Sequence, residues 1–240
     1  MIRLRSLLYL CIMAVTVILY SIPIAVLGWF MPLQWGGRIS SSWARVNLVA
    51  LESICGLGYR VTGIDNLPSG AYIVLSKHQS AWETIALRAL LPPEHVWVLK
   101  RELMWVPFFG WALAALKPIA IDRQSVRRSI KQLQKQGLAA LSAGRPIVIF
   151  PEGTRVAPGT HGKYGVGGAM LAAKSGVPLV PVAHNAGVFW RRRDINKYPG
   201  TIDLVVGTPI PTHGLSASAI NEKVEDWIET TVASLPSRHG

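Results

Sequence analysis

The segment KHQSAWET at residues 77–84 contains a histidine, His78, and a carboxylate, Glu83, five positions apart. On one continuous helix of ~3.6 residues per turn the two side chains would point about 140° apart and could not pair. If His78 lies in a loop after a strand and Glu83 in the first turn of the next helix, the carboxylate can reach the imidazole. A carboxylate on one ring nitrogen leaves the other free to accept a proton, so the pattern predicts a general base for a hydroxyl nucleophile.

Two other interpretations of this segment stay open. The run SAWE matches a capping box, in which Glu83 only satisfies backbone N–H groups at the start of a helix. Ser80 could be a nucleophile with His78 as its base, although side chains two residues apart rarely face each other correctly. The segment offers no more obvious enzyme nucleophile, which favours direct attack by a substrate hydroxyl over a covalent intermediate.

The segment FPEGTR at residues 150–155 contains groups suited to an anion. Gly153 permits a tight turn that exposes backbone N–H groups, and the planar guanidinium of Arg155 can bind a phosphate through two hydrogen bonds. Glu152 could accept a hydrogen bond from a substrate hydroxyl or hold Arg155 in place. An ordinary Pro-Glu-Gly turn is the alternative. A candidate base and a candidate phosphate binder in one chain are much rarer than either alone.

Short apolar runs and amphipathic stretches alternate beyond residue 58, which predicts strands and helices in alternation. This order indicates an α/β fold with a mixed, largely parallel sheet flanked by helices, whose sites form at the carboxyl ends of strands. The predicted strands are 59–62, 72–75, 96–99, 119–121, 147–150, 179–183 and 202–206. The predicted helices are 81–91, 126–142, 166–175 and 216–235.

The first 57 residues have a different character and predict a membrane anchor. Residues 7–30 carry no charge, and a bilayer-spanning helix needs about 20 such residues. Pro23 and Pro32 would bend or end a straight span, and a second, partly apolar stretch at 39–57 could pair with the first. A single span and a helical hairpin embedded in one leaflet both remain open. We expect a membrane-anchoring unit at 1–57 and an α/β domain at 58–240.

The net charge of +12 is confined to one part of the chain. Residues 100–200 hold sixteen Lys and Arg against four Asp and Glu, which accounts for the whole excess. Such a block predicts an anionic partner, which could be nucleic acid, a membrane surface or a phosphorylated substrate. Within it, the run 191–193 of three arginines is taken as a solvated loop. The two cysteines, Cys11 and Cys55, lie in the apolar segments and form no disulfide framework or metal-ligand spacing.

Four blocks in a fixed order resemble the 1-acylglycerol-3-phosphate acyltransferase family, over roughly residues 60–210. The blocks are residues 78–83, the stretch from KREL at 100–103 to IDR at 121–123, FPEGTR at 150–155, and VPLVPV at 177–182. Each block alone is weak, but their order makes the resemblance specific. The family resemblance implies a membrane-embedded N-terminus and a cytosolic α/β domain.

The resemblance also implies roles for particular positions. His78 would be the catalytic base and Glu83 its orienting partner. The glycerol phosphate would be held by Arg123, Glu152, Gly153 and Arg155, with Thr154 lining the same pocket and Lys100 a candidate for stabilising the oxyanion.

The chain departs from the family pattern at two positions of the first block. Glu83 stands where aspartate is commoner, and Lys77 stands where asparagine is commoner. The lysine could oppose protonation of His78.

The activity implied is transfer of a fatty acyl group from acyl-CoA or an acyl carrier protein to the sn-2 hydroxyl of lysophosphatidic acid, giving phosphatidic acid. We expect membrane lipids as partners, no nucleic acid, and a place in the inner membrane with the site facing the cytoplasm. No metal or organic cofactor is expected. The other histidines form no ligand spacing; they are His95, His161, His184, His213 and His239. Alternatives are acylation of another lyso-lipid, such as a lyso-ornithine lipid, and a non-catalytic lipid-binding protein.

Overall fold

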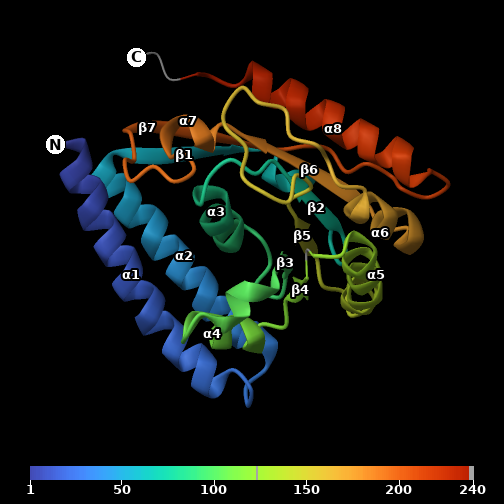
Figure 1. Cartoon of the computed structure of the whole chain (residues 1–240), viewed down its shortest axis with the longest axis horizontal. Helices are drawn as coiled ribbons and strands as arrows, with labels where there is room; N and C mark the ends of the chain where they lie inside the picture. The colour runs from blue at the N-terminus through green and yellow to red at the C-terminus, as the bar shows by residue number, and fades with distance from the viewer. Residues whose placement is uncertain (123, 238–240) are drawn as a thin grey trace.

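The fold is a seven-stranded sheet with helices on both faces, preceded by two long helices (Figure 1). It is seen in a computed structural model that describes residues 1–122 and 124–237. The helices are α1 (Ile2–Leu27), α2 (Leu33–Cys55), α3 (Trp82–Leu90), α4 (Phe109–Ala115), α5 (Val126–Ser142), α6 (Gly167–Ser175), α7 (Ala186–Phe189) and α8 (Ala217–Ser234), with the 3-10 turns η1 (Ile64–Asn66) and η2 (Arg101–Trp105). The strands are β1 (Leu57–Thr62), β2 (Ile73–Ser76), β3 (Val96–Lys100), β4 (Ile119–Ile121), β5 (Ile147–Ile149), β6 (Leu179–His184) and β7 (Gly200–Val206).

The sheet is mixed and largely parallel, as the sequence predicts. Its strand order is β1-β7-β6-β2-β5-β3-β4, and only the pairing of β6 with β7 is antiparallel. Strand β2 lies between β5 and β6, and β3 follows β5, so the segments after β2, β5 and β3 leave the sheet at the same edge. The loops at residues 77–81 and 150–155 are therefore neighbours in space although they are far apart in sequence.

The two faces of the sheet are covered by different helices. Because side chains alternate along a strand, Val74 of β2 packs with α2, α3 and α7, while Ile73 and Leu75 pack with α5, α6 and α8. The same alternation holds in β5, where Val148 faces the first group of helices. Figure 1 shows α8 and α5 on the side of the sheet opposite to α2.

The N-terminal helices form an antiparallel pair (Figure 1). Pro23 lies inside α1, and Pro32 directly precedes α2, so the second proline and not the first marks the break. Polar groups fix the pair in register, because Thr16 Oγ1 accepts hydrogen bonds from Trp43 Nε1 at 3.3 Å and from Asn47 Nδ2 at 3.1 Å. The pair remains attached to the α/β part, since α2 packs on α3 and α1 on α4.

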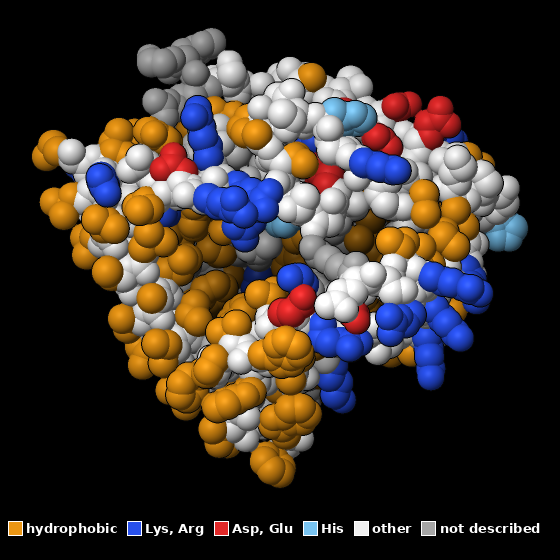
Figure 2. All heavy atoms as spheres, in the orientation of Figure 1, with side chains coloured by type: hydrophobic (Ala, Val, Ile, Leu, Met, Phe, Trp, Pro, Cys, Tyr) orange, Lys and Arg blue, Asp and Glu red, His pale blue; other side chains and the backbone are white. Residues whose placement is uncertain are grey.

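One side of α1 is apolar and exposed. Leu8, Val15, Leu19 and Val26 recur at helical spacing and face away from the rest of the chain. By length and composition α1 could cross a membrane. Figure 2 shows apolar side chains spread over this side and over the end of the molecule at which α1 turns into α2.

Helix α4 was not predicted, and several aromatic residues lie in it or just before it. Trp105, Phe108 and Trp111 are exposed, while Phe109 is partly buried. The exposed rings belong to the same end of the molecule as Phe30, which is 89% exposed. This favours the membrane–water interface over the core for those three rings.

The exposed side of α1 leads to a prediction about membrane binding. Leu19→Lys would place a charge where apolar contact is expected, at a cost of about 2.5–3.5 kcal/mol if the position lies deep in the bilayer. We expect a much smaller membrane-bound fraction in vesicle flotation, with thermal stability unchanged. Thr208→Lys, which adds the same charge at an exposed position of the α/β part, should float like the parent protein. Equal flotation of both variants would contradict a lipid-facing α1.

Candidate active site

His78 and Glu83 are paired across the start of α3. His78 lies two residues after β2, and Glu83 is the second residue of α3, so the loop between them lets the side chains meet. The distance from His78 Nδ1 to Glu83 Oε1 is 2.8 Å. The carboxylate is fully buried, whereas the imidazole retains 14% exposure. The predicted pairing geometry is confirmed.

Glu83 also binds backbone N–H groups of the loop just before α3, so it has a structural role in addition to its contact with His78. Its Oε1 accepts hydrogen bonds from the N–H groups of Gln79 and Ser80, each at 2.8 Å. Burial by itself would raise the pKa of the Glu83 carboxyl, but the pKa lies below its ordinary value because the imidazoles of His184 and His78 and the Ser80 N–H stabilise the anion. An ionised acceptor at this place favours the proton of His78 on Nδ1, which leaves Nε2 as the basic nitrogen.

The side chain of Ser80 stabilises the backbone at the start of α3. It is fully buried, and its Oγ accepts a hydrogen bond from the N–H of Trp82 at 3.2 Å. Since Nδ1 of His78 is bound to Glu83, this arrangement favours helix capping over a nucleophilic role for Ser80.

A second histidine, His184, holds the loop that carries His78 through a hydrogen bond to the backbone. This role was not predicted from the sequence. His184 ends β6, beside β2, and is fully buried. Its Nε2–H donates to the carbonyl of Lys77 at 2.8 Å, and its Nδ1 accepts from the N–H of Ala186 at 3.2 Å, which defines a neutral ring. Burial lowers the pKa of His184. Only the adjacency of the strands reveals this contact, because nothing in the spacing links residues 77 and 184.

Glu152 has different partners from those expected. Its Oε2 accepts a hydrogen bond from the backbone N–H of His78 at 2.8 Å, and its Oε1 lies 2.9 Å from Lys77 Nζ, with both side chains essentially buried. Burial raises the pKa of Glu152 to about 7, although the Lys77 charge opposes the shift. Glu152 thus joins the second motif to the first, and these contacts favour a role in positioning His78 over direct contact with substrate.

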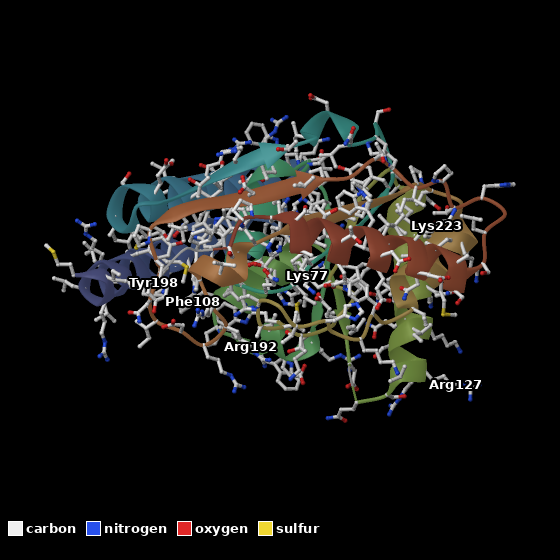
Figure 3. All side chains as sticks on the ribbon, turned by 90° about the horizontal axis from the view of Figure 1, so that it is seen from above. Lys77, Phe108, Arg127, Arg192, Tyr198 and Lys223 are labelled. Carbon is white, nitrogen blue, oxygen red and sulfur yellow. The ribbon has the colours of Figure 1, made fainter. Side chains whose placement is uncertain are left out.

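Lys77 points away from the imidazole that it was expected to influence. Its Nζ is fully buried and lies 2.6 Å from Glu229 Oε1 on α8, in addition to Glu152. Tyr164 donates a hydrogen bond to the same Glu229 oxygen at 2.8 Å. Figure 3 shows Lys77 in the middle of the molecule, beside α8. Two carboxylates neutralise this lysine, so it acts on His78 through the backbone of the loop.

Further contacts hold the two motif loops together. The ring of Phe150 stacks on the imidazole of His78, with centroids 4.0 Å apart. The N–H of Val156 donates to the carbonyl of His78 at 2.9 Å. The backbone of Gly153 has a φ of 67°, which confirms the tight turn expected there. The backbone and the ring of His78 are therefore both fixed by the second motif.

A cavity of about 540 Å³ opens beside His78. At one end it is lined by polar and charged residues, namely His78, Lys100, Gly153, Thr154, Arg155 and Arg192. Elsewhere it is mainly apolar, with Val17 and Ile24 from α1, Trp43 from α2 and Leu113 from α4 among its lining residues, although Arg88 and a few hydroxyl side chains also line it. Figure 2 shows a hollow in this face with basic side chains beside it. The cavity therefore has a polar head beside the base and an apolar body beneath the N-terminal helices.

Some of the remaining predicted site residues line the same cavity as His78. Thr154 and Arg155 line the polar end of the cavity, and Lys100 lines it while its Nζ lies 2.9 Å from Glu102 Oε1. Arg123 lies outside the described residues. His161 lines a different cavity against α8, where its Nε2 lies 3.1 Å from Glu225 Oε1. Within residues 1–122 and 124–237, no group of three or more His, Cys, Asp or Glu side chains is arranged to hold a metal ion.

The chain is similar to proteins of known activity. A family model described as Acyltransferase matches residues 58–185. The chain is 44% identical to the 1-acyl-sn-glycerol-3-phosphate acyltransferase of Pseudomonas aeruginosa over 200 residues, which cover 82% of this chain and 77% of that protein. It is 29% identical to human 1-acyl-sn-glycerol-3-phosphate acyltransferase alpha over 174 residues, or 72% of this chain and 62% of the relative.

One solved structure has the same fold. The crystal structure of the 1-acyl-sn-glycerophosphate (LPA) acyltransferase PlsC from Thermotoga maritima superposes with a TM-score of 0.80 and 21% identity. The superposition covers 99% of this chain and 97% of that one. The two N-terminal helices are thus included in the shared fold.

The buried ion pairs of Lys77 predict a large effect on stability. At a pH above the Glu152 pKa of about 7, Lys77→Met would leave this carboxylate buried without its cation, which typically costs about 3–5 kcal/mol of unfolding free energy. Denaturant unfolding should show this loss, whereas Lys174→Met, on the exposed side of α6, should change stability by less than about 0.5 kcal/mol.

The double variant Lys77→Met/Glu152→Gln separates the ion pair from simple packing. It removes the buried negative charge together with its partner, so it should recover part of the lost stability. A double variant as unstable as the sum of the two single variants would show that the pair is not coupled.

Proposed function

The chain belongs to the acyltransferase family, and on that premise we propose that it transfers a fatty acyl group from an acyl thioester to the sn-2 hydroxyl of lysophosphatidic acid. The names of the relatives support this acceptor. The observation that carries the proposal is the polar end of the cavity, where the imidazole of His78 and the guanidinium of Arg155 line the same space above an apolar body.

In this proposal the basic residues bind the phosphate first. Arg155 holds the phosphate group, with Arg123 as a further candidate; Thr154 lines the pocket, and Lys100 is a candidate for stabilising the oxyanion. Binding at that point brings the sn-2 hydroxyl to Nε2 of His78. Positioning of this kind can supply ~7 kcal/mol or more of the barrier reduction, because two large substrates no longer have to meet in the correct orientation.

His78 then acts as the base. As Nε2 takes the hydroxyl proton, the oxygen attacks the thioester carbonyl and a tetrahedral intermediate forms. Glu83 stabilises the imidazolium through its hydrogen bond with Nδ1–H. When the intermediate collapses, the carbon–sulfur bond breaks and the imidazolium returns its proton to the leaving thiolate. The products are phosphatidic acid and the free thiol of coenzyme A or of an acyl carrier protein.

The apolar body of the cavity suits a hydrocarbon chain. It is lined by α1, α2 and α4, whose outer faces expose Leu19, Val49 and Trp111. An acyl chain could therefore pass from a membrane into the cavity without crossing water. We propose that residues 1–57 anchor the enzyme in the inner membrane, with the domain at 58–240 on the cytoplasmic side, where anionic lipids attract basic residues.

The direct test is a transfer assay with purified protein, lysophosphatidate and each thioester donor in turn. We expect phosphatidic acid with at least one donor and a much lower rate with a lyso-lipid that lacks the phosphate, such as a lyso-ornithine lipid. His78→Ala should lower kcat by about 10²–10⁴-fold while membrane binding persists. Unchanged turnover in this variant would defeat the proposed base, and a preference for the phosphate-free acceptor would defeat the proposed substrate.

The stabilisation of the His78 imidazolium by Glu83 can be separated from the structural contacts that Glu83 makes with the loop before α3. Glu83→Gln keeps oxygen and nitrogen atoms near the same places but removes the negative charge that stabilises the imidazolium. We expect kcat to fall by about 10²-fold or more, with little change in the KM for lysophosphatidate. Glu83→Asp, which keeps the charge on a shorter side chain, should retain more activity than Glu83→Gln. Equal losses in the two variants would indicate that the carboxylate matters only for folding.

A further inference from the structure

Arg192 lies outside the four motif blocks yet lines the cavity that contains His78 and Arg155. It belongs to the arginine run 191–193, which the sequence suggested to be a solvated loop. The run follows α7 and forms a turn, because the N–H of Asp194 donates to the carbonyl of Arg191 at 3.2 Å. Arg193 has a φ of 63° in this turn, a conformation that residues other than glycine rarely adopt.

The guanidinium of Arg192 is tied to the second motif. Its Nη1 donates a hydrogen bond to the backbone carbonyl of Arg155 at 3.0 Å. A guanidinium has five N–H donors in a fixed plane, so one such bond orients the group and leaves others for a ligand. The contact places the guanidinium of Arg192 beside the backbone of Arg155, and both residues line the cavity.

The charges of these two arginines are not neutralised within the described part of the chain. Neither guanidinium has an Asp or Glu oxygen of the described residues within ion-pair distance, whereas Lys100 in the same cavity is paired with Glu102. Two uncompensated cations beside a largely apolar cavity favour the binding of an anion with two charges.

The turn that carries Arg192 is anchored to α1. The N–H of Lys197 donates to Ser6 Oγ at 2.8 Å, and the ring of Trp190 packs edge-on against Tyr9 at 5.7 Å. Figure 3 shows Arg192 projecting from this segment on the side of the molecule away from β1. Arg192 is thus supplied by a segment that is fixed at both ends, which reduces the entropy lost when a ligand binds.

We propose that Arg192 and Arg155 form a two-arginine clamp for a phosphomonoester, and that its ligand is the phosphate of the acyl acceptor. The clamp deepens the proposed function and rests on it. A phosphomonoester carries nearly two negative charges at neutral pH, which matches the two guanidinium groups. The same chemistry exists in the 3′-phosphate of coenzyme A but not in the phosphodiester that links the prosthetic group of an acyl carrier protein. Arg192 is therefore a substrate-binding residue that the motif blocks do not contain.

The test compares Arg192→Ala with Arg191→Ala in the transfer assay. Both variants lose one arginine of the same run, but Arg191 does not line the cavity. We expect Arg192→Ala to raise the KM for lysophosphatidate about tenfold or more with a nearly unchanged kcat, and Arg191→Ala to behave like the parent protein. Arg192→Lys keeps the charge but lacks the planar guanidinium, so its KM for lysophosphatidate should lie between those of Arg192→Ala and the parent protein.

Varying each substrate separately identifies the source of the phosphate. A higher KM for acyl-CoA, with no change for lysophosphatidate, would overturn the assignment to the acceptor and place the coenzyme phosphate in the clamp. Equal kinetics of Arg192→Ala and Arg191→Ala with every substrate would overturn the clamp itself.

A binding measurement without catalysis separates this proposal from the proposed function. Glycerol 3-phosphate should bind the parent protein in calorimetry, and Arg192→Ala should weaken that binding by about tenfold or more, whereas Arg191→Ala should not. Such binding in a protein that fails to acylate lysophosphatidate would leave the clamp standing and remove the function. Acyl transfer to lysophosphatidate by the parent protein, together with glycerol 3-phosphate binding that Arg192→Ala does not weaken, would support the proposed function and overturn the clamp.

Discussion

The buried carboxylate of Glu83 is the constraint on which the rest of the site depends. It accepts hydrogen bonds from the N–H groups of Gln79 and Ser80 and from Nδ1 of His78, so one anion fixes the loop before α3 and orients the imidazole. A carboxylate without exposure is tolerated only when such donors satisfy it. Fixing the loop and orienting a base are therefore not competing explanations here, because the same carboxylate does both. Loss of this charge would disturb the loop and the tautomer together.

The sheet provides the second constraint, because it decides which loops meet. Strands β2 and β5 are parallel neighbours, so Lys77 and His78 leave the sheet beside Glu152. The Glu152 carboxylate then binds the backbone of His78, while Lys77 extends the contact to Glu229 on α8. Glu83 thus holds the ring of His78, and Glu152 holds its backbone. This leaves the polar end of the cavity to the arginines and the apolar body to the N-terminal helices.

Much of this arrangement could be predicted from the sequence, and the remainder could not for physical reasons. The seven strands are present, the bounds of α5 are those predicted, and the pairing of His78 with Glu83 follows from a loop beside a helix start, which is local information. The burial of Glu152 against Lys77, and the support from His184, depend on which strands lie side by side. Helix α4 is too short to show a clear period, and the cavity exists only when α1, α2 and α4 pack over the sheet. The arginine run 191–193 is exposed, as predicted, but the hydrogen bond of Arg192 to Arg155 could not be predicted because it joins segments that share no motif.

The central claim is that Glu83 holds the proton of His78 on Nδ1 and leaves Nε2 as the base facing the cavity. The most direct measurement is ¹⁵N NMR of protein labelled at histidine, with the His78 signals assigned by their loss in His78→Ala. The account predicts that the neutral form of the His78 ring carries its proton on Nδ1 and has an unprotonated Nε2. A neutral His78 ring with its proton on Nε2 would contradict the account, since the nitrogen needed as the base would already carry the proton.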